Sequence, residues 1–152
     1  MVILRIRGSV AIRKELEYTF KLLHLHKKNH ATIIRGHPTH LGMLQKIKDY
    51  ATWGEASIET IALLLSKKGR LKGNRRLTDN HVKENFGWDS INSFAEAIAK
   101  KKIDIWKLPT LKPVFRLHPP KGGFHRSIKK PYPKGELGYR GEDINKLIKK
   151  MI

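Results

Sequence analysis

Near the start of the chain stands the stretch Val2-Ile3-Leu4-Arg5-Ile6-Arg7, followed by Gly8. Its pattern gives the first indication of the fold. Apolar residues recur there at every second position, beginning with Val2, and therefore lie on one face of an extended strand. Arg5 and Arg7 share the opposite face. The stretch therefore predicts a half-buried strand that ends at the glycine.

Beyond this strand the hydrophobic period changes from two residues to between three and four. Apolar residues from Ile12 to Leu23 have the spacing of one helix face, and residues 31–35 have the pattern of a second strand. A helix over residues 40–50, which Thr39 can cap, and a short strand over residues 51–53 follow. This β-α-β-α-β order predicts an α+β fold, a small sheet with helices packed on one side.

The remaining sequence predicts a helical middle and a basic C-terminal part. Helices are expected over residues 58–68, 79–86 and 90–102, and their predicted caps are Ser57, Thr78 or Asp79, and Asp89. Residues 114–118 alternate like a strand, residues 121–141 are rich in glycine and proline and predict a loop, and residues 142–151 predict a terminal helix. We expect a single domain over residues 1–152, made of a core (1–55), a helical insertion (56–112) and a basic C-terminal extension (113–152).

Composition bounds the possible functions. The 152 residues include 32 Lys and Arg against 13 Asp and Glu, a formal net charge of +19, and 39% are hydrophobic, which allows a real core. Such an excess predicts a polyanionic partner, first nucleic acid and then an anionic membrane surface. The absence of cysteine excludes disulfides, iron–sulfur clusters and cysteine-based zinc sites. With no signal-peptide or membrane-span pattern, we expect a soluble, intracellular protein.

The positive charge is concentrated in two segments that contain no acidic residue. Residues 67–76 hold six Lys or Arg, and eight more lie between Asp104 and Glu136, so the two segments hold fourteen of the 32 cations. A charge run is often only a solvated face. These segments, however, contain glycine and lack carboxylates that could neutralise them, and glycine allows close approach to a phosphate. We call them the first and the second acid-free segment.

Aromatic residues are interleaved with the cations of the C-terminal part. Phe124, Tyr132 and Tyr139 offer ring faces on which unpaired bases can stack, although packing within the protein is the alternative for each of them. No predicted helix has a basic face opposite a bulky apolar one, so the pattern favours RNA over a membrane.

The strand patterns offer a second possible cationic surface. Arg5 and Arg7 share one strand face, and Arg116 and His118 share another. If these faces point away from the helices, one side of the sheet is cationic. The alternative is that the arginines extend from edge strands to the solvent.

Catalytic and metal-binding patterns are absent from the sequence. Five of the eight histidines lie between residues 24 and 40, but His24 and His26 point to opposite faces and no carboxylate stands at ligand spacing beside them. We therefore expect no metal, no cofactor and no small-molecule substrate, and we assign the histidines to phosphate or base contacts. No phosphate-binding loop motif or nucleophile motif occurs, so we expect no enzymatic activity.

Several motifs in the same order resemble one known family. The C-terminal part contains Arg116-Leu117-His118-Pro119-Pro120-Lys121-Gly122-Gly123-Phe124 and Gly135-Glu136-Leu137-Gly138-Tyr139-Arg140-Gly141, before the terminal helix. The rest contains Leu23-His24-Leu25-His26-Lys27-Lys28-Asn29-His30, Gly42-Met43-Leu44, Thr52-Trp53-Gly54-Glu55 and Leu77-Thr78-Asp79. With these motifs the whole chain resembles the archaeal type of large-subunit ribosomal protein thirty, which is related to the eukaryotic large-subunit protein seven.

The resemblance implies a β-α-β-α-β core with an antiparallel sheet, similar to a ferredoxin-like fold, and a structural role without catalysis. It also implies large-subunit ribosomal RNA and neighbouring ribosomal proteins as partners, a cytoplasmic location in that subunit, and no homo-oligomer or membrane contact. A non-ribosomal RNA- or DNA-binding protein and an RNA-modifying enzyme are the alternatives.

The resemblance implies that the loop from Gly8 to Arg13, the turn from Lys27 to His30 and the start of the helix near His40 face RNA. The expected RNA contacts combine these family positions with the acid-free segments. From the family positions and the strand faces we take Arg5, Arg7, Arg13, Lys27, Lys28, His30, His40, Arg116 and His118. From the first acid-free segment we take Lys67, Lys68, Arg70, Lys72, Arg75 and Arg76. From the C-terminal part we take Lys121, Gly122, Gly123, Phe124, His125, Arg126, Lys129, Lys130, Lys134, Tyr139 and Arg140.

Overall fold

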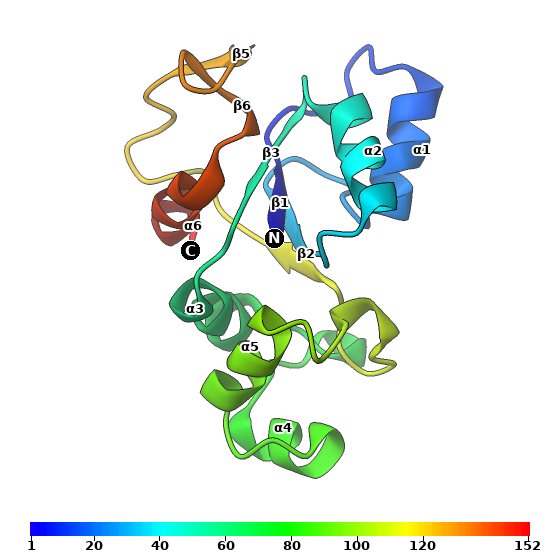
Figure 1. Cartoon of the computed structure of the whole chain (residues 1–152), viewed down its shortest axis with the longest axis vertical. Coiled ribbons are helices and arrows are strands. Elements are labelled where there is room, and N and C mark those ends of the chain that lie inside the picture. Colours follow the sequence, from blue (N-terminus) through cyan, green and yellow to red (C-terminus); the bar gives the residue numbers. More distant parts are fainter.

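A six-stranded mixed sheet organises the chain, with the strand order β4-β2-β1-β3-β6-β5 (Figure 1). The computed structural model describes residues 1–152. The strands are β1 (Val2–Arg5), β2 (His30–Ile33), β3 (Ala51–Gly54), β4 (Val114–Arg116), β5 (Ser127–Pro131) and β6 (Gly135–Tyr139). The helices are α1 (Lys14–Leu22), α2 (Pro38–Ile47), α3 (Ile58–Lys68), α4 (Asp79–Phe86), α5 (Ile91–Ala99) and α6 (Ile144–Met151).

The α+β class is confirmed, but the expectation of a purely antiparallel sheet is wrong. β1 pairs antiparallel with β2 and β3, and β2 pairs antiparallel with β4. β6 instead runs parallel to β3, and β5 pairs parallel with β6 in an irregular register. Parallel pairing of β3 and β6 requires the chain to return to the end of the sheet where β3 began. The long connection between the two strands allows this return, whereas a tight hairpin joins only antiparallel strands.

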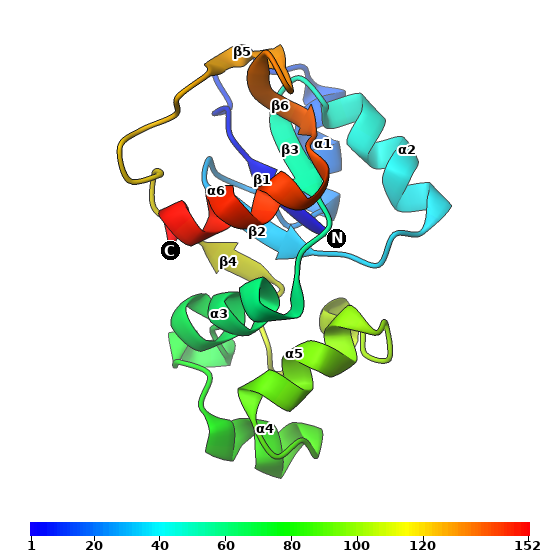
Figure 2. The same ribbon diagram turned by 60° about the vertical axis from the view of Figure 1, so that its left-hand side comes forward.

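Helices cover both faces of the sheet, whereas the sequence analysis placed them on one side (Figure 2). On one face, Phe20 of α1 and Leu44 of α2 pack with Ile3. On the other face, α6 and α3 pack against the side of β1 that holds Val2 and Leu4. β1 is therefore a central strand buried on both sides, and all four of its residues are buried.

This double burial contradicts both alternatives given for Arg5, an exposed cationic sheet face and an edge strand from which the side chain extends to solvent. Its side chain is 1% exposed and its guanidinium lies 4.2 Å from the Phe20 ring centre, beneath α1. The guanidinium donates hydrogen bonds to the carbonyls of Arg7, Leu25 and His26 and to Ser9 Oγ. Arg5 is satisfied inside the protein, because a planar group with five donors can bind several carbonyls at once, and it is not available to a phosphate.

Two helix caps differ from the predicted ones. The ring of His37, not Thr39, caps α2 by accepting a hydrogen bond from the Thr39 amide. Ser90, not Asp89, caps α5 in a reciprocal capping box with Ser93. The caps Ser57 and Thr78 are confirmed.

Residues 121–141 are not only a loop, because β5 and β6 lie within them. Gly135, Glu136 and Leu137 are buried. The sequence pattern missed β6 because two of its five residues are glycines and one is a glutamate, so no hydrophobic alternation marks it. The terminal helix is confirmed as α6, and its apolar stripe is buried as the spacing predicts.

Gly54 marks the closest backbone approach between β3 and the turn before α6. A Cβ atom at Gly54 would overlap the carbonyl oxygen of Gly141 and press on Ile144. Gly42, in contrast, lies in α2 with open space around its Cα.

We therefore expect Gly54→Ala to lower the free energy of unfolding by about 1–3 kcal/mol, as overpacking of a core does. The matched variant Gly42→Ala should raise it by about 0.5–1 kcal/mol, because alanine is the better helix former. Urea unfolding followed by circular dichroism measures both. Equal midpoints for the two variants would contradict the close approach.

Candidate nucleic-acid interface

The cations of the two acid-free segments have no ion-pair partners. The five ion pairs of the structure use Arg35, Lys100, Arg140, Lys146 and Lys149. None of the fourteen Lys and Arg of the acid-free segments takes part in any of them. The protein therefore leaves this charge available to an external anion.

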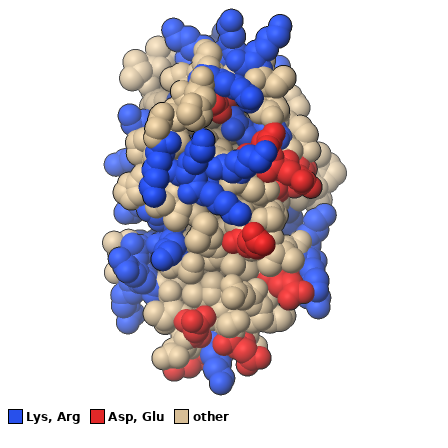
Figure 3. Space-filling model, turned by 90° about the vertical axis from the view of Figure 1, so that its left-hand side faces the viewer, with Lys and Arg blue, Asp and Glu red and all other residues tan.

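The surface charge is unevenly distributed. Figure 3 shows Lys and Arg side chains over the upper half of one face and along both sides of its lower half, while Asp and Glu lie mainly toward one side and at the lower end. Figure 1 places α6, β5 and β6 in that upper half and α4 at the lower end. A surface with this distribution attracts a polyanion in a defined orientation.

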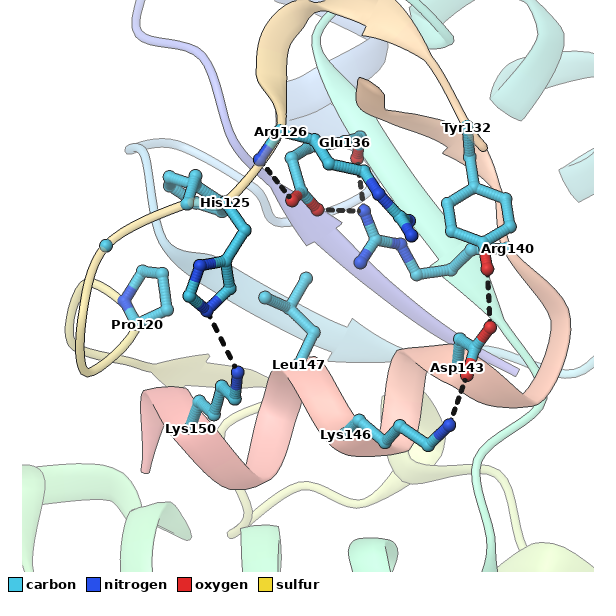
Figure 4. A pocket seen from close by; sticks show the side chains of 12 residues that line it. Pro120, His125, Arg126, Tyr132, Glu136, Arg140, Asp143, Lys146, Leu147 and Lys150 are labelled. Atoms are coloured by element: carbon cyan, nitrogen blue, oxygen red, sulfur yellow. Dashed lines mark hydrogen bonds and ion pairs between the residues drawn. The ribbon is translucent and has the colours of Figure 1, made fainter. Parts of the chain in front are cut away.

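A cavity of about 320 Å³ lies between the second acid-free segment, β6 and α6 (Figure 4). It gathers five of the residues predicted to bind RNA, namely Gly123, Phe124, His125, Arg126 and Arg140. Lys146 and Lys150 of α6 also line it, and His125 and Lys150 are joined by a hydrogen-bonding contact of 3.2 Å.

A buried ion pair builds the back of this cavity. Arg140 Nη2 lies 2.5 Å from Glu136 Oε2, and both side chains are less than a tenth exposed. The Arg126 amide donates to the other carboxylate oxygen, and Arg140 Nε donates to Thr52 Oγ1. Arg140 is therefore a positioning residue that joins β6 to β3. The prediction that its guanidinium binds RNA is wrong, because the group is already bound within the protein.

Tyr132 closes one side of the cavity. The guanidinium groups of Arg126 and Arg140 lie 5.2 and 5.3 Å from its ring centre. The Tyr132 hydroxyl donates a hydrogen bond to the Asp143 carboxylate. This hydrogen bond and the one from Lys146 lower the pKa of Asp143. The aromatic ring is thus engaged within the protein, as the packing alternative for this residue proposed.

A second, smaller cavity of about 180 Å³ lies where β2 and β4 meet the first acid-free segment. It brings together His30, Arg70 and Arg116, three predicted residues that lie far apart in the sequence. His26, Asn74 and Lys112 complete its polar lining, and no carboxylate lines it. We call it the β2–β4 cavity.

The pKa of His30 is lowered in this cavity. Partial burial lowers its pKa most, and the positive charges of Arg116, His26, Lys27 and Arg5 lower it further. The same effect acts at the end of α3, where partial burial and the neighbouring Arg70 lower the pKa of Lys68. In both groups burial is the larger cause of the lowered pKa, and the neighbouring positive charges add to it.

A third cavity, of about 440 Å³, opens beside the end of β1. Arg7, Lys28 and Lys129 line it together with Phe124 of the first cavity, so three further predicted residues share one concave surface. The guanidinium of Arg7 lies 4.7 Å from the Tyr50 ring centre and donates to the Asp49 carbonyl, which fixes its position.

The other predicted residues lie outside the three cavities. His40 is turned toward the protein, because its ring contacts Trp106 at 5.5 Å and its Nδ1 is hydrogen-bonded to the Arg35 carbonyl. The hydroxyl of the exposed Tyr139 donates to Glu55, which raises the tyrosine pKa. Lys68 is half-buried, and the exposed remainder are Arg13, Lys27, Lys67, Lys72, Arg75, Arg76, His118, Lys121, Gly122, Lys130 and Lys134.

Sequence reasoning missed five residues that line the first two cavities. Lys112 stands in the second acid-free segment and could have been chosen from that signal, and His26 belongs to the histidine group. Asn74 lies in the first acid-free segment but carries no charge, and Lys146 and Lys150 lie outside both segments. They reach the cavities through the turn after Leu71 and through the orientation of α6, which only packing decides.

The structure contains no group of three or more metal-ligating side chains. None of the helices is both long and apolar enough to span a membrane.

Comparison with known proteins decides the family. The model of the family described as Ribosomal protein L30p/L7e matches residues 1–51. The large ribosomal subunit protein uL30 of Archaeoglobus fulgidus is 50% identical over 149 residues, covering 98% of this chain and 97% of the relative. The chain belongs to the L30p/L7e family of ribosomal proteins.

Other L30p/L7e relatives agree over the same extent. The uL30 protein of Methanopyrus kandleri is 49% identical over 148 residues, covering 96% of this chain and 99% of the relative. That of Staphylothermus marinus is 50% identical over 156 residues, covering 99% and 96%. The resemblance stated from sequence motifs is confirmed, and the family consists of structural components rather than enzymes.

The buried Glu136–Arg140 ion pair behind the first cavity should contribute to the stability of the fold. Glu136→Ala leaves Arg140 buried without its partner, so we expect the free energy of unfolding to fall by about 3–5 kcal/mol. The control Glu96→Ala removes a solvent-exposed ion pair with Lys100 and should leave stability nearly unchanged. Thermal unfolding measures both variants. A Glu136 variant as stable as the Glu96 variant would show that the pair does not hold β6 in place.

Proposed function

We propose that this L30p/L7e chain is a structural constituent of the large ribosomal subunit and binds ribosomal RNA through its acid-free segments. The relatives support the first part of the proposal, because they are named as large ribosomal subunit proteins and are about 50% identical over nearly the whole chain. The observation that carries the RNA contact is that the fourteen cations of these segments have no ion-pair partner in the protein.

The mechanism of binding is charge neutralisation on a preformed surface. Lys and Arg side chains replace the counterions of RNA phosphates, and the released counterions favour binding. Gly122 and Gly123 both have positive φ values and no neighbour within 4 Å of a Cβ position, so their backbone can approach a phosphate closely. Neighbouring ribosomal proteins would contact the remaining surface, with one copy of the chain in each subunit.

The chain divides, in this proposal, into parts of one domain. Residues 1–55 would form a ferredoxin-like β-α-β-α-β core, residues 56–112 a helical insertion, and residues 113–152 a basic extension. The hydrophobic cluster that includes Leu4, Phe94 and Ile148 supports a single domain, because these three residues come from the three parts.

The proposal predicts steep salt dependence. If six to ten phosphates are contacted, affinity for large-subunit ribosomal RNA should fall by about 10³–10⁵ between 50 and 200 mM salt. Filter binding over this range measures the slope of log affinity against log salt concentration. A flat salt response would refute binding through the cations.

A matched pair of triple variants tests which cations act. Replacing Lys72, Arg75 and Arg76 by Gln removes three unpaired cations, so the salt slope should fall by about one for each phosphate that is no longer neutralised. Replacing Lys100, Lys146 and Lys149 by Gln removes the same charge from residues with carboxylate partners and should change the slope less. Equal effects would mean that only net charge matters.

Ribosomal and non-ribosomal binding are distinguished by co-sedimentation. The chain should remain with large subunits through a high-salt wash, because many contacts are made together in the assembled particle. Complete release, together with equal affinity for unrelated RNA and DNA, would support the alternative of a general nucleic-acid binder.

A further inference from the structure

The β2–β4 cavity carries a more specific inference, which rests on the proposed function. We propose that this cavity is a preformed binding site (a seat) for one backbone phosphate of RNA. Arg70, Lys112 and Arg116 would bind the phosphate, and His30 lines the same cavity.

The lining of the cavity has the chemistry of an anion site. Two arginines, one lysine, two histidines and one asparagine face it from three separate parts of the chain, and no carboxylate is among the lining residues. Guanidinium groups bind phosphate oxygens with two parallel hydrogen bonds, and lysine adds a point charge. A cavity of about 180 Å³ holds the volume of about six waters at liquid density, which is room for a phosphate with part of its hydration.

Backbone hydrogen bonds fix the walls of the cavity. His30 and Arg116 stand opposite each other in the β2–β4 register. The Lys112 amide donates to the Arg70 carbonyl at 2.8 Å, and the Lys72 amide donates to the Thr110 carbonyl at 2.9 Å. The three cations are therefore brought together before any ligand binds, which reduces the entropy cost of binding.

The polar groups of the cavity are unsatisfied within the protein. His30 Nδ1 is buried and has no hydrogen-bond partner. The side chains of Arg70, Lys112 and Arg116 belong to none of the ion pairs in the structure. Buried donors and acceptors normally find partners, so the absence of one here points to an external group.

The cavity of Figure 4 shows what a self-satisfied site looks like. Its carboxylates Glu136 and Asp143 already bind Arg140 and Lys146. A phosphate there would be repelled by these two carboxylates. The β2–β4 cavity has cations without such competition, and it is the better phosphate site for that reason.

Histidine titration in the free full-length chain tests the proposal. Following the His30 ring by NMR in chloride buffer, we expect added inorganic phosphate or dimethyl phosphate to raise its pKa, because a bound anion favours the imidazolium. Arg116→Gln should abolish that response. Lys83→Gln, at an exposed position of α4 outside the cavity and outside both acid-free segments, should preserve it. Dimethyl phosphate mimics the phosphodiester, so a response to inorganic phosphate alone would refute an RNA seat.

RNA binding provides the second readout. Arg116→Gln should weaken affinity for large-subunit ribosomal RNA roughly tenfold, as removal of a charge-assisted hydrogen bond does, and lower the salt slope by about one. Lys83→Gln should have a smaller effect, because Lys83 lies outside both acid-free segments. Because Arg116 is exposed, folding is expected to persist, and circular dichroism checks it; if Arg116→Gln does not fold, Lys112→Gln gives the same two readouts.

The outcomes separate this inference from the proposed function. If His30 does not respond to either phosphate while RNA binding stays steeply salt-dependent, the seat is refuted and the proposed function stands. If His30 responds but RNA binding is flat with salt, the proposed function fails and the cavity is an anion site of another kind, which refutes an RNA seat as well.

Discussion

The burial of β1 on both faces is the constraint on which the rest of the structure depends. Val2, Ile3 and Leu4 are completely buried, with α1 and α2 packed on one side and α6 and α3 on the other. Burial of this kind supplies most of the folding free energy. It also requires the polar end of the strand to be satisfied internally, and Arg5 meets that requirement with hydrogen bonds to carbonyls beneath α1.

A core closed in this way allows the surface to stay strongly cationic. A net charge of +19 destabilises the compact state through self-repulsion. Some of its carboxylates support the fold directly, as the buried Glu136 and the Tyr132-bound Asp143 do. The cations of the acid-free segments are left without partners at the edge of the molecule, where a polyanion can offset the repulsion. Membership of the L30p/L7e family is consistent with this division between core and surface.

The success and failure of sequence reasoning follow from the range of the interactions involved. Local signals predicted α3 with its cap Ser57 and the apolar stripe of α6 correctly, because caps and helical spacing act over a few residues. β6 was missed because its stability comes from pairing with β3 and from the Glu136–Arg140 pair, which no local pattern records. The inward turn of His40 toward Trp106 was likewise invisible, since the two residues are distant in the sequence.

By itself the sequence determined the class of fold, the family and the kind of partner, because composition, periodicity and motif order are properties of the chain alone. Only the tertiary structure decided which cations are available. It turned Arg5 and Arg140 inward and brought His30, Arg70 and Arg116 together around one cavity. The physical reason is that electrostatic function depends on distances in space and on burial, and these are set by long-range packing rather than by neighbours along the chain.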